Sequence, residues 1–190
     1  RLAPEFPYPM GIDDCQYALE QYKEVLTGVH FSEQLIIVGD SAGGAICTTL
    51  ASNNLTNERV NIDKQVLVYP SVDYTLGHDS VDENGTGFLL EKEKILWYFD
   101  NYFQSNKERK GSSPLYMPMN QNIPKTFIIT AGCDPLRDEG IAYKNALISK
   151  GVEVEHHIFD DLIHAYMLLD SLVENQCRQT YQLIGDFIKT

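Results

Sequence analysis

A serine flanked by small residues stands between a run of β-branched residues and a helical stretch. The segment Gly39-Asp40-Ser41-Ala42-Gly43 has the G-x-S-x-G spacing of a nucleophile elbow, in which a sharp strand-to-helix turn strains the serine backbone. Residues without bulk are expected beside such a turn, which accounts for Gly39 and Gly43. The sequence therefore predicts that Ser41 presents a nucleophilic hydroxyl at the end of a strand.

The helix that follows Ser41 is expected to stabilise negative charge beside it. Amides in the first turn of a helix lack intrahelical acceptors and lie at the positive end of the helix dipole. We therefore expect the Ala42 N–H to donate to an oxyanion formed at Ser41. The spacings of the dinucleotide-binding and phosphate-binding glycine loops are both absent from the sequence, which argues against a nucleotide site.

A serine hydroxyl needs a base, and the base needs an acid that fixes its tautomer. Asp134 directly follows one expected strand and His164 follows the next, in the chain order Ser, Asp, His that accompanies an elbow. Both residues are expected at the carboxyl end of a parallel sheet, where open α/β sheets bind ligands. The candidate catalytic residues are therefore Ser41, Asp134 and His164.

Plainer interpretations stay open for two of these residues. Asp134 precedes a proline and could cap the following helix, and His164 could be a hydrogen-bonded histidine without a catalytic role. The other histidines are weaker candidates: His30 and His78 in loops, and His156 and His157 inside a strand.

Hydrophobic periodicity predicts the scaffold that positions these residues. Short β-branched runs alternate with stretches of helical spacing, which is typical of crossover units that build a parallel sheet, so the fold class is α/β. The expected strands are 34–39, 65–69, 126–130 and 152–159, and the expected helices are 12–26, 43–52, 91–103, 139–150 and an amphipathic helix over 169–188.

Two strands and one long segment have distinct patterns. Strand 34–39 is a continuous apolar run and is expected to be covered on both faces. Strand 152–159 alternates with Glu153, Glu155 and His157 and is expected at an edge. Residues 72–113 lack strand patterning and are expected to leave the sheet as a polar loop followed by a helix, within a single domain over 1–190.

Length and charge limit the possible partners. With 190 residues, 43% of them apolar, the chain suits one domain with a hydrophobic core. Fifteen basic against 27 acidic residues give a net charge of -12, which repels nucleic acid and anionic membranes. Since no apolar run approaches the roughly 18 residues of a spanning helix, we expect neither a nucleic-acid partner nor a membrane span.

The four cysteines lie far apart in the sequence. Cys15, Cys47, Cys133 and Cys177 show no C-x-x-C spacing, so we expect packed, reduced thiols rather than a zinc site or a disulfide framework. The sequence does not determine the compartment, although it favours the cytoplasm over secretion.

With these residues identified, the whole chain resembles the hormone-sensitive-lipase-like family of α/β-hydrolase carboxylesterases. The resemblance rests on 1–9 and Asp13-Asp14, on the elbow 39–44, and on the turn Asp134-Pro135-Leu136-Arg137-Asp138-Glu139-Gly140. It implies an α/β-hydrolase fold with Asp134, rather than Asp138, as the acid. His164 matches the family's base position, although Ala165 and Tyr166 stand where the family usually has Gly and Phe.

One motif of the family is absent from this sequence. The His-Gly-Gly-Gly loop, which supplies other oxyanion donors, lies upstream of the segment matched by 1–5. The resemblance implies that the chain holds only the last four strands of the sheet, and we expect roughly 100 or more further N-terminal residues in the protein. Without them, we expect poor solubility, because strand 35–38 would have an open edge, and little activity. We expect Arg1, Glu5, Asp13 and Asp14 to form structural ion pairs and caps.

The expected function is that of a serine carboxylesterase acting on small or medium acyl esters. Ser41 would form an acyl-enzyme, and water activated by His164 would hydrolyse it, with no metal or organic cofactor. Two alternatives stay open: a hydrolase-like protein that only binds a ligand, and an inactive piece of an esterase. The natural substrate, the acyl length and the oligomeric state are not determined by the sequence.

Overall fold

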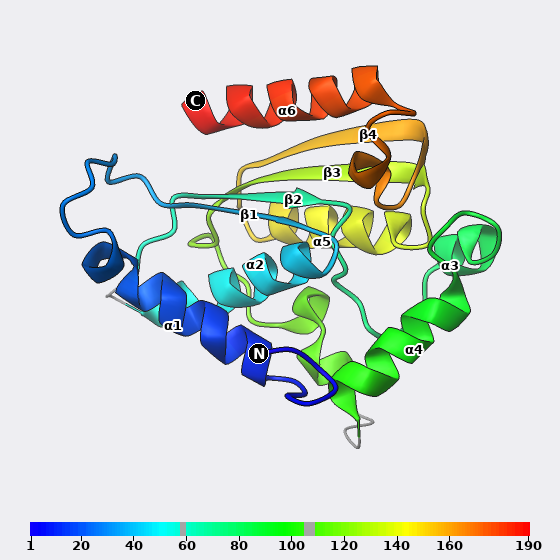
Figure 1. Cartoon of the computed structure of the whole chain (residues 1–190), viewed down its shortest axis with the longest axis horizontal. Helices are drawn as coiled ribbons and strands as arrows, with labels where there is room; N and C mark the ends of the chain where they lie inside the picture. The colour runs from blue at the N-terminus through cyan, green and yellow to red at the C-terminus, as the bar shows by residue number, and fades with distance from the viewer. Residues whose placement is uncertain (58–59, 105–108) are drawn as a thin grey trace.

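The computed structural model describes residues 1–57, 60–104 and 109–190 and contains one four-stranded parallel sheet (Figure 1). Its strands are β1 (Ile36–Asp40), β2 (Lys64–Val68), β3 (Lys125–Cys133) and β4 (Val154–Ile163). They pair in the order β1-β2-β3-β4, and all three pairs are parallel. The expected α/β class and the four expected strands are confirmed, and the carboxyl ends of all four strands therefore lie along the same edge of the sheet.

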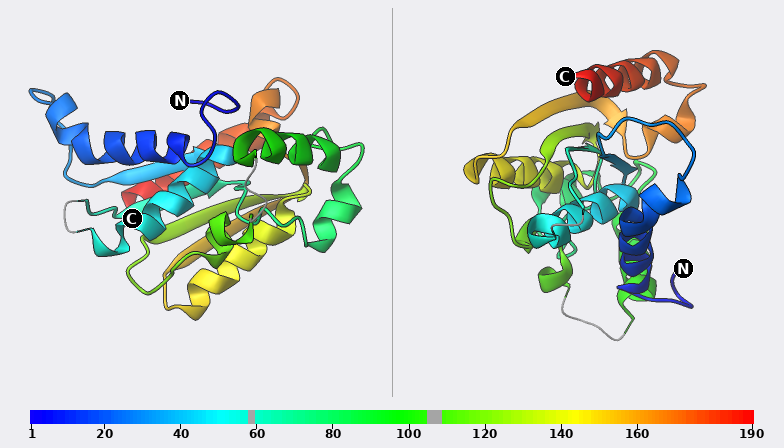
Figure 2. Two further views of the ribbon diagram at one scale, coloured as in Figure 1. Left: turned by 90° about the horizontal axis from the view of Figure 1, so that it is seen from below. Right: turned by 90° about the vertical axis from the view of Figure 1, so that its left-hand side faces the viewer.

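Helices cover the two faces of the sheet unequally. Figure 1 shows α1, α2 and α5 on one face and α6 on the other, and Figure 2 shows the same layers from two further directions. The helices are α1 (Met10–Val25), α2 (Ala42–Asn53), α3 (Asp79–Asn84), α4 (Lys92–Phe103), α5 (Arg137–Ser149) and α6 (Glu174–Lys189). Within the described ranges, none of them is long and apolar enough to cross a membrane.

The core consists of two hydrophobic layers separated by the sheet. Val66 and Val68 of β2 pack toward α6 with Phe127 and Phe187, while Leu67 packs on the opposite side with Leu147 of α5. This alternation follows from the period of two along a strand. Every residue of β2 is buried, as expected for a strand with neighbours on both sides and helices on both faces.

Strand β1 is less covered than its apolar sequence predicts. It lies at an edge of the sheet, and Val38 is 53% exposed. Val38 pairs in register with Val66, but the hydrophobic cluster beneath α6 includes Val66 and not Val38. The expectation that β1 is covered on both faces is therefore wrong for the described part of the chain.

Strand β4 lies at the other edge, as expected, but it is longer than its sequence pattern predicts. It continues to Ile163 through the exposed residues Asp160 and Asp161, opposite a register shift between Ala131 and Cys133. Paired aspartates usually favour turns, but an edge strand can expose them to water.

Two helix predictions need correction. The final helix begins at Glu174 and not at 169. Leu169 ends a 3₁₀ turn and Leu172 is 77% exposed. The apolar residues before Glu174 therefore have helical spacing but are not part of the helix. Helix α3 was expected as a polar loop, because only Val81 interrupts its polar sequence.

Arg1 and Asp14 form the expected ionic contact, whereas the N-terminal cap residue of α1 is Pro9, without the expected side-chain cap, and the role of Glu5 stays a prediction. The Arg1 guanidinium donates to Asp14 from Nη2 at 2.7 Å and from Nε at 3.1 Å, and these hydrogen bonds hold the pKa of Asp14 below its usual value. Asp13 lies in the first turn of α1, where a carboxylate is favourable to the helix dipole.

A buried glutamate ties the segment after β2 to α5. Glu139 is fully buried in the first turn of α5, and its Oε1 accepts hydrogen bonds from the amides of Val72 at 2.7 Å and Asp73 at 3.2 Å. Its Oε2 is buried and has no hydrogen-bond partner among the described residues. Burial raises the pKa of Glu139 well above its usual value, although the two amide hydrogen bonds oppose this. The side chain therefore holds its proton more tightly than it does in the unfolded chain.

We predict that the stability of the Glu139→Gln variant, compared with that of the wild type, increases as the pH rises. A raised pKa in the folded state stabilises the fold below the unfolded pKa, and this contribution is lost as the pH rises toward the folded pKa, by about 1.4 kcal/mol per pH unit. Glutamine keeps the Oε1 acceptor and does not titrate. Urea unfolding from about pH 5 to pH 8 should therefore favour the variant increasingly. The control is Glu93→Gln, since Glu93 is an exposed glutamate in the first turn of α4. Its free energy of unfolding should differ from that of the wild type by the same amount at every pH in this range. A constant difference for Glu139→Gln would contradict the prediction.

Candidate active site

Ser41 occupies a strained turn between β1 and α2. Its backbone has φ 50° and ψ -115°, a conformation that residues with a side chain rarely adopt. The Ser41 amide donates to the carbonyl of Val68 at 2.9 Å, and the Ser41 carbonyl accepts from the amides of Ala45 and Ser71, each at 3.2 Å. These bonds attach the turn both to α2 and to the end of β2.

The glycines around Ser41 have different roles. A Cβ on Gly39 would lie 2.3 Å from the carbonyl of Gly43, so position 39 requires glycine. A Cβ on Gly43 would meet only Asp40 Oδ1, at 3.7 Å, so the expectation that Gly43 itself has no room for a side chain is wrong. Gly44, which the sequence analysis did not single out, is tighter, because its Cβ would lie 2.7 Å from Pro70 Cβ.

The structure brings Ser41, His164 and Asp134 into one hydrogen-bonded chain. Ser41 Oγ lies 2.8 Å from His164 Nε2, and His164 Nδ1 lies 2.8 Å from Asp134 Oδ2. Both His164 and Asp134 are buried. Because a carboxylate only accepts hydrogen bonds, Nδ1 carries the imidazole hydrogen and Nε2 is left to accept the serine hydroxyl. The arrangement can therefore withdraw a proton from Ser41.

Asp134 contacts His164 and also closes a local turn, but it is not the cap of α5, whose N-terminal cap residue is Leu136 without a side-chain hydrogen bond. Its Oδ2 faces His164, while its Oδ1 accepts a hydrogen bond from the Leu136 amide at 2.8 Å and closes the turn into α5. The local role fixes the carboxyl group in the orientation that the contact with His164 needs.

Helix α3 holds the turn that carries Asp134. The hydroxyl of Ser80 donates to the carbonyl of Pro135 at 2.8 Å, and the side-chain amide of Asn84 donates to the carbonyl of Asp134 at 3.3 Å. Neither Ser80 nor Asn84 is predicted from the sequence as a site residue, because the polar composition of their segment indicates a loop. The available signal was their i, i+4 spacing, which places two polar side chains on one face of a helix.

Asp138 lies in the first turn of α5 and pairs with Arg137 and α3 rather than with His164. Its Oδ2 accepts from the Ser80 amide at 2.9 Å and its Oδ1 from Arg137 Nε at 2.8 Å. Partial burial alone would raise the pKa of Asp138, but the bonds from Arg137 and Ser80 bring it below its usual value. The two acids therefore differ in their contacts: Asp134 faces the imidazole and Asp138 joins α5 to α3.

The other histidines make contacts away from Ser41. His78 Nε2 lies 3.1 Å from Asp73 Oδ2, and His156 Nε2 lies 2.9 Å from the hydroxyl of Thr130. Burial lowers the pKa of His156 to about 4, so it is neutral at neutral pH. His157 packs against the ring of Phe159, and His30 is exposed before β1.

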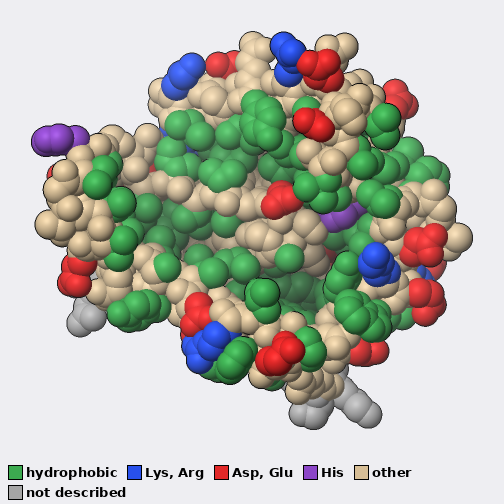
Figure 3. All heavy atoms as spheres, in the orientation of Figure 1, with side chains coloured by type: hydrophobic (Ala, Val, Ile, Leu, Met, Phe, Trp, Pro, Cys, Tyr) green, Lys and Arg blue, Asp and Glu red, His purple; other side chains and the backbone are tan. Residues whose placement is uncertain are grey.

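Ala42, the expected oxyanion donor, is the first residue of α2. Its amide is one of those that a helix leaves without an intrahelical acceptor, and it directly follows the strained serine. The space-filling view shows the face in front of this region hollowed between the sheet and α4, with hydrophobic side chains around the hollow (Figure 3).

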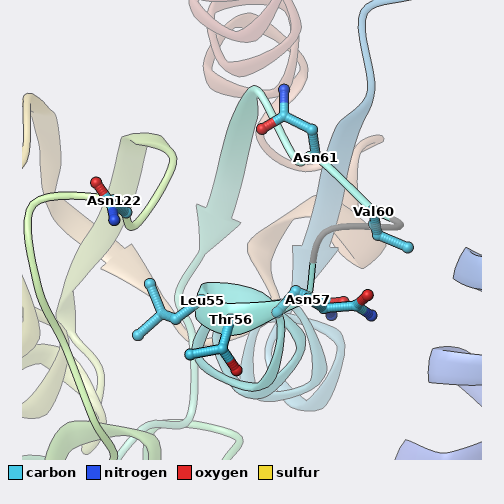
Figure 4. Close-up of a pocket in the computed structure, with 7 residues that line it drawn as sticks. Leu55, Thr56, Asn57, Val60, Asn61 and Asn122 are labelled. Atoms are coloured by element: carbon cyan, nitrogen blue, oxygen red, sulfur yellow. The ribbon is translucent and has the colours of Figure 1, made fainter.

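A separate cavity of about 600 Å³ lies near the amino-terminal end of β2, at the opposite end of the sheet from Ser41 (Figure 4). Amide side chains dominate its lining: Asn54, Asn57, Asn61 and Asn122. It contains none of the residues singled out from the sequence.

Several curated proteins are similar to this chain. It is 32% identical over 178 residues to an ethyl acetate hydrolase of Pseudomonas putida, covering 92% of this chain and 56% of that protein. It is also 32% identical to carboxylesterase NlhH of Mycobacterium tuberculosis, covering 88% of this chain and 54% of that protein. The chain thus spans about half the length of the curated relatives it matches.

Solved structures have the same arrangement of elements. A hyperthermophilic esterase from Pyrobaculum calidifontis superposes with a TM-score of 0.90 at 26% identity, covering 97% of this chain and 62% of that one. A mutant of LAE6, an alpha/beta hydrolase enzyme from the metagenome of Lake Arreo, superposes with a TM-score of 0.91 at 28% identity, covering 100% and 62%.

The family model described as alpha/beta hydrolase fold matches residues 1–168. This match includes the elbow, the acid turn and His164, and it agrees with the parallel sheet and with the named relatives. The chain therefore belongs to the alpha/beta hydrolase family, among its carboxylesterase-like members.

Proposed function

We propose that this chain carries the catalytic residues of a serine carboxylesterase. The observation that supports the proposal most directly is the hydrogen-bonded chain from Ser41 Oγ through His164 to Asp134, at a strained strand-to-helix turn. Relatives named ethyl acetate hydrolase and carboxylesterase favour small or medium acyl esters as substrates. A role limited to ligand binding is less well supported, because the base and the acid both stand at hydrogen-bond distance in their places.

The proposed reaction forms and then hydrolyses an acyl-enzyme. Ser41 Oγ attacks the ester carbonyl carbon while its proton passes to His164 Nε2, and the carbonyl oxygen becomes an oxyanion near the Ala42 N–H. The oxyanion collapses, the bond to the alcohol oxygen breaks, and His164 returns the proton to the leaving alcohol. Water then attacks the acyl carbon and passes a proton to His164; the bond from this carbon to Ser41 Oγ breaks as His164 returns the proton to Oγ, and the carboxylic acid is released. Asp134 holds the imidazole tautomer and stabilises the imidazolium in both halves.

The site as described is expected to need further groups. A single amide at Ala42 is a minimal oxyanion site, and each missing donor costs roughly 10²–10³ in rate. We propose that further residues of the protein supply another donor and pair with the open edge of β1. The exposure of Val38 and the coverage of about half of each curated relative support this. We propose that 72–104 forms one wall of the site, since Tyr74 and Phe99 pack in the same cluster as Ala45, one turn beyond the elbow.

We predict that a fluorophosphonate probe labels Ser41 in the full-length protein with one equivalent. Ser41→Ala should abolish labelling and lower ester turnover by about 10⁴-fold or more, because no other group would form the acyl-enzyme. Ser52→Ala is the control, since Ser52 lies on the same helix but bonds the carbonyl of Pro118. Intact-mass spectrometry and an ester-hydrolysis assay provide the measurements. Hydrolysis that survives in Ser41→Ala would refute the esterase proposal.

We also predict opposite outcomes for the two acids. Asp134→Asn should lower kcat by about 10⁴-fold with the fold retained, because an amide that donates to Nδ1 holds the imidazole in the wrong tautomer. Asp138→Asn should change kcat little, because its carboxyl contacts Arg137 and Ser80 instead. Steady-state kinetics and circular dichroism test both variants. The reverse ranking would show that the acid has been assigned wrongly.

A further inference from the structure

Tyr69 combines deep burial with an unfavourable backbone conformation. It directly follows β2, is 1% exposed, and has φ 36°, in the left-handed region that a bulky side chain rarely adopts. Such a conformation is unfavourable and persists only where the surroundings enforce it. Strained residues of this kind cluster at functional sites, and here Ser41 and Ala165, at the ends of β1 and β4, also have positive φ.

The ring of Tyr69 lies against the imidazole of His164. The two ring centroids are 4.8 Å apart with an interplanar angle of 58°, and Tyr166 packs edge-on against Tyr69 at 5.5 Å. The imidazole thus contacts Asp134 at Nδ1, Ser41 at Nε2 and an aromatic ring beside its plane.

The hydroxyl of Tyr69 reaches the elbow. Tyr69 Oη lies 3.4 Å from Oδ2 of Asp40, and Asp40 is the residue before Ser41. Burial, together with the nearby Asp40 carboxyl, raises the pKa of Tyr69, so the hydroxyl stays protonated and donates to Asp40. One side chain therefore contacts both the segment that carries Ser41 and the ring of His164.

We propose that Tyr69 is a positioning residue whose ring keeps the His164 imidazole aligned between Ser41 and Asp134, with its hydroxyl held by Asp40. The proposal rests on the function proposed above. The imidazole needs this support most after acylation. Ser41 Oγ is then bonded to the acyl group and no longer donates to Nε2, so without Tyr69 only Asp134 would hold the imidazole. The ring of Tyr69 still restricts its rotation while water attacks.

The expected size of the effect follows from the geometry of proton transfer. A displacement of about 1 Å at a reacting group lowers a rate by as much as about 10²-fold. The ring also lies within the roughly 6 Å over which aromatic rings attract cations, and the imidazole is cationic while it holds the proton from Ser41 or water. Loss of the ring should therefore lower kcat without weakening substrate binding.

The test compares variants of the full-length protein by kcat and KM, with active sites counted by fluorophosphonate titration. Tyr69→Met fills the space with a flexible side chain that lacks a ring, and Tyr69→Leu offers the same comparison should the methionine variant fail to fold. We expect kcat to fall about 10–100-fold with KM nearly unchanged. Tyr69→Phe, which restores the ring, should return kcat to within several-fold of the wild type.

A matched control separates positioning from packing. Phe159→Leu removes an aromatic ring from the same hydrophobic cluster, where Phe159 contacts Tyr166. It should lower stability while leaving kcat per titrated site unchanged. Wild-type kcat in Tyr69→Met or Tyr69→Leu, or an equal loss of kcat in Phe159→Leu, would overturn the proposal. If the wild type itself neither reacts with the probe nor hydrolyses esters, the esterase proposal fails instead.

Discussion

The site depends on the close approach of two stretches of main chain, at Gly39 in β1 and at Gly43 in α2. The space that a Cβ of Gly39 would occupy lies 2.3 Å from the Gly43 carbonyl, so no larger residue fits without displacing the backbone. At this separation the chain must reverse direction within one residue, and Ser41 takes the positive φ that the reversal requires. The direction of the Ser41 side chain is thus determined by main-chain contact, which leaves its hydroxyl free to bond His164.

His164 and Asp134 lie beside Ser41 because parallel strands end at the same edge of the sheet. Asp134 follows β3 and His164 follows β4, and the pairing of these neighbours brings together side chains 30 residues apart in sequence. The edge alone does not orient them. Asp134 is fixed by the amide of Leu136 and by α3, whereas His164 is enclosed by Asp134, Ser41 and Tyr69. Segments that the sequence pattern treats as connections therefore hold the chemical groups in place.

Two kinds of feature can be predicted from the sequence. The first are helices and strands with strong hydrophobic periodicity, and the second are residues that a chemical motif places at a fixed spacing or chain order. Local patterns predict strands β2 and β3 and helix α5. They also predict the group Ser41, Asp134 and His164. What escaped prediction depends on tertiary contacts. Helix α3 has almost no apolar face and is held by hydrogen bonds to the acid turn, and the left-handed backbone of Tyr69 has no sequence signal because tyrosine does not favour it. The open edge of β1 was expected from the resemblance, but the exposure of Val38 was not, because an apolar run indicates a tendency to be buried and does not identify the covering partner.

The residues after His164 show how a departure from the family pattern can be accommodated. Alanine at position 165, with φ 58°, lies in a region that costs a non-glycine residue about 1–2 kcal/mol, whereas glycine would enter it freely. Tyrosine at position 166 brings a hydroxyl that lies 2.6 Å from Thr180 Oγ1. Thr180 donates its own hydrogen to the Gln176 carbonyl, so Tyr166 must be the donor to Thr180. A buried hydrogen bond of this kind contributes about 1 kcal/mol and attaches the loop to α6. The two departures therefore act in opposite directions on stability, and the second restrains the turn that the first strains.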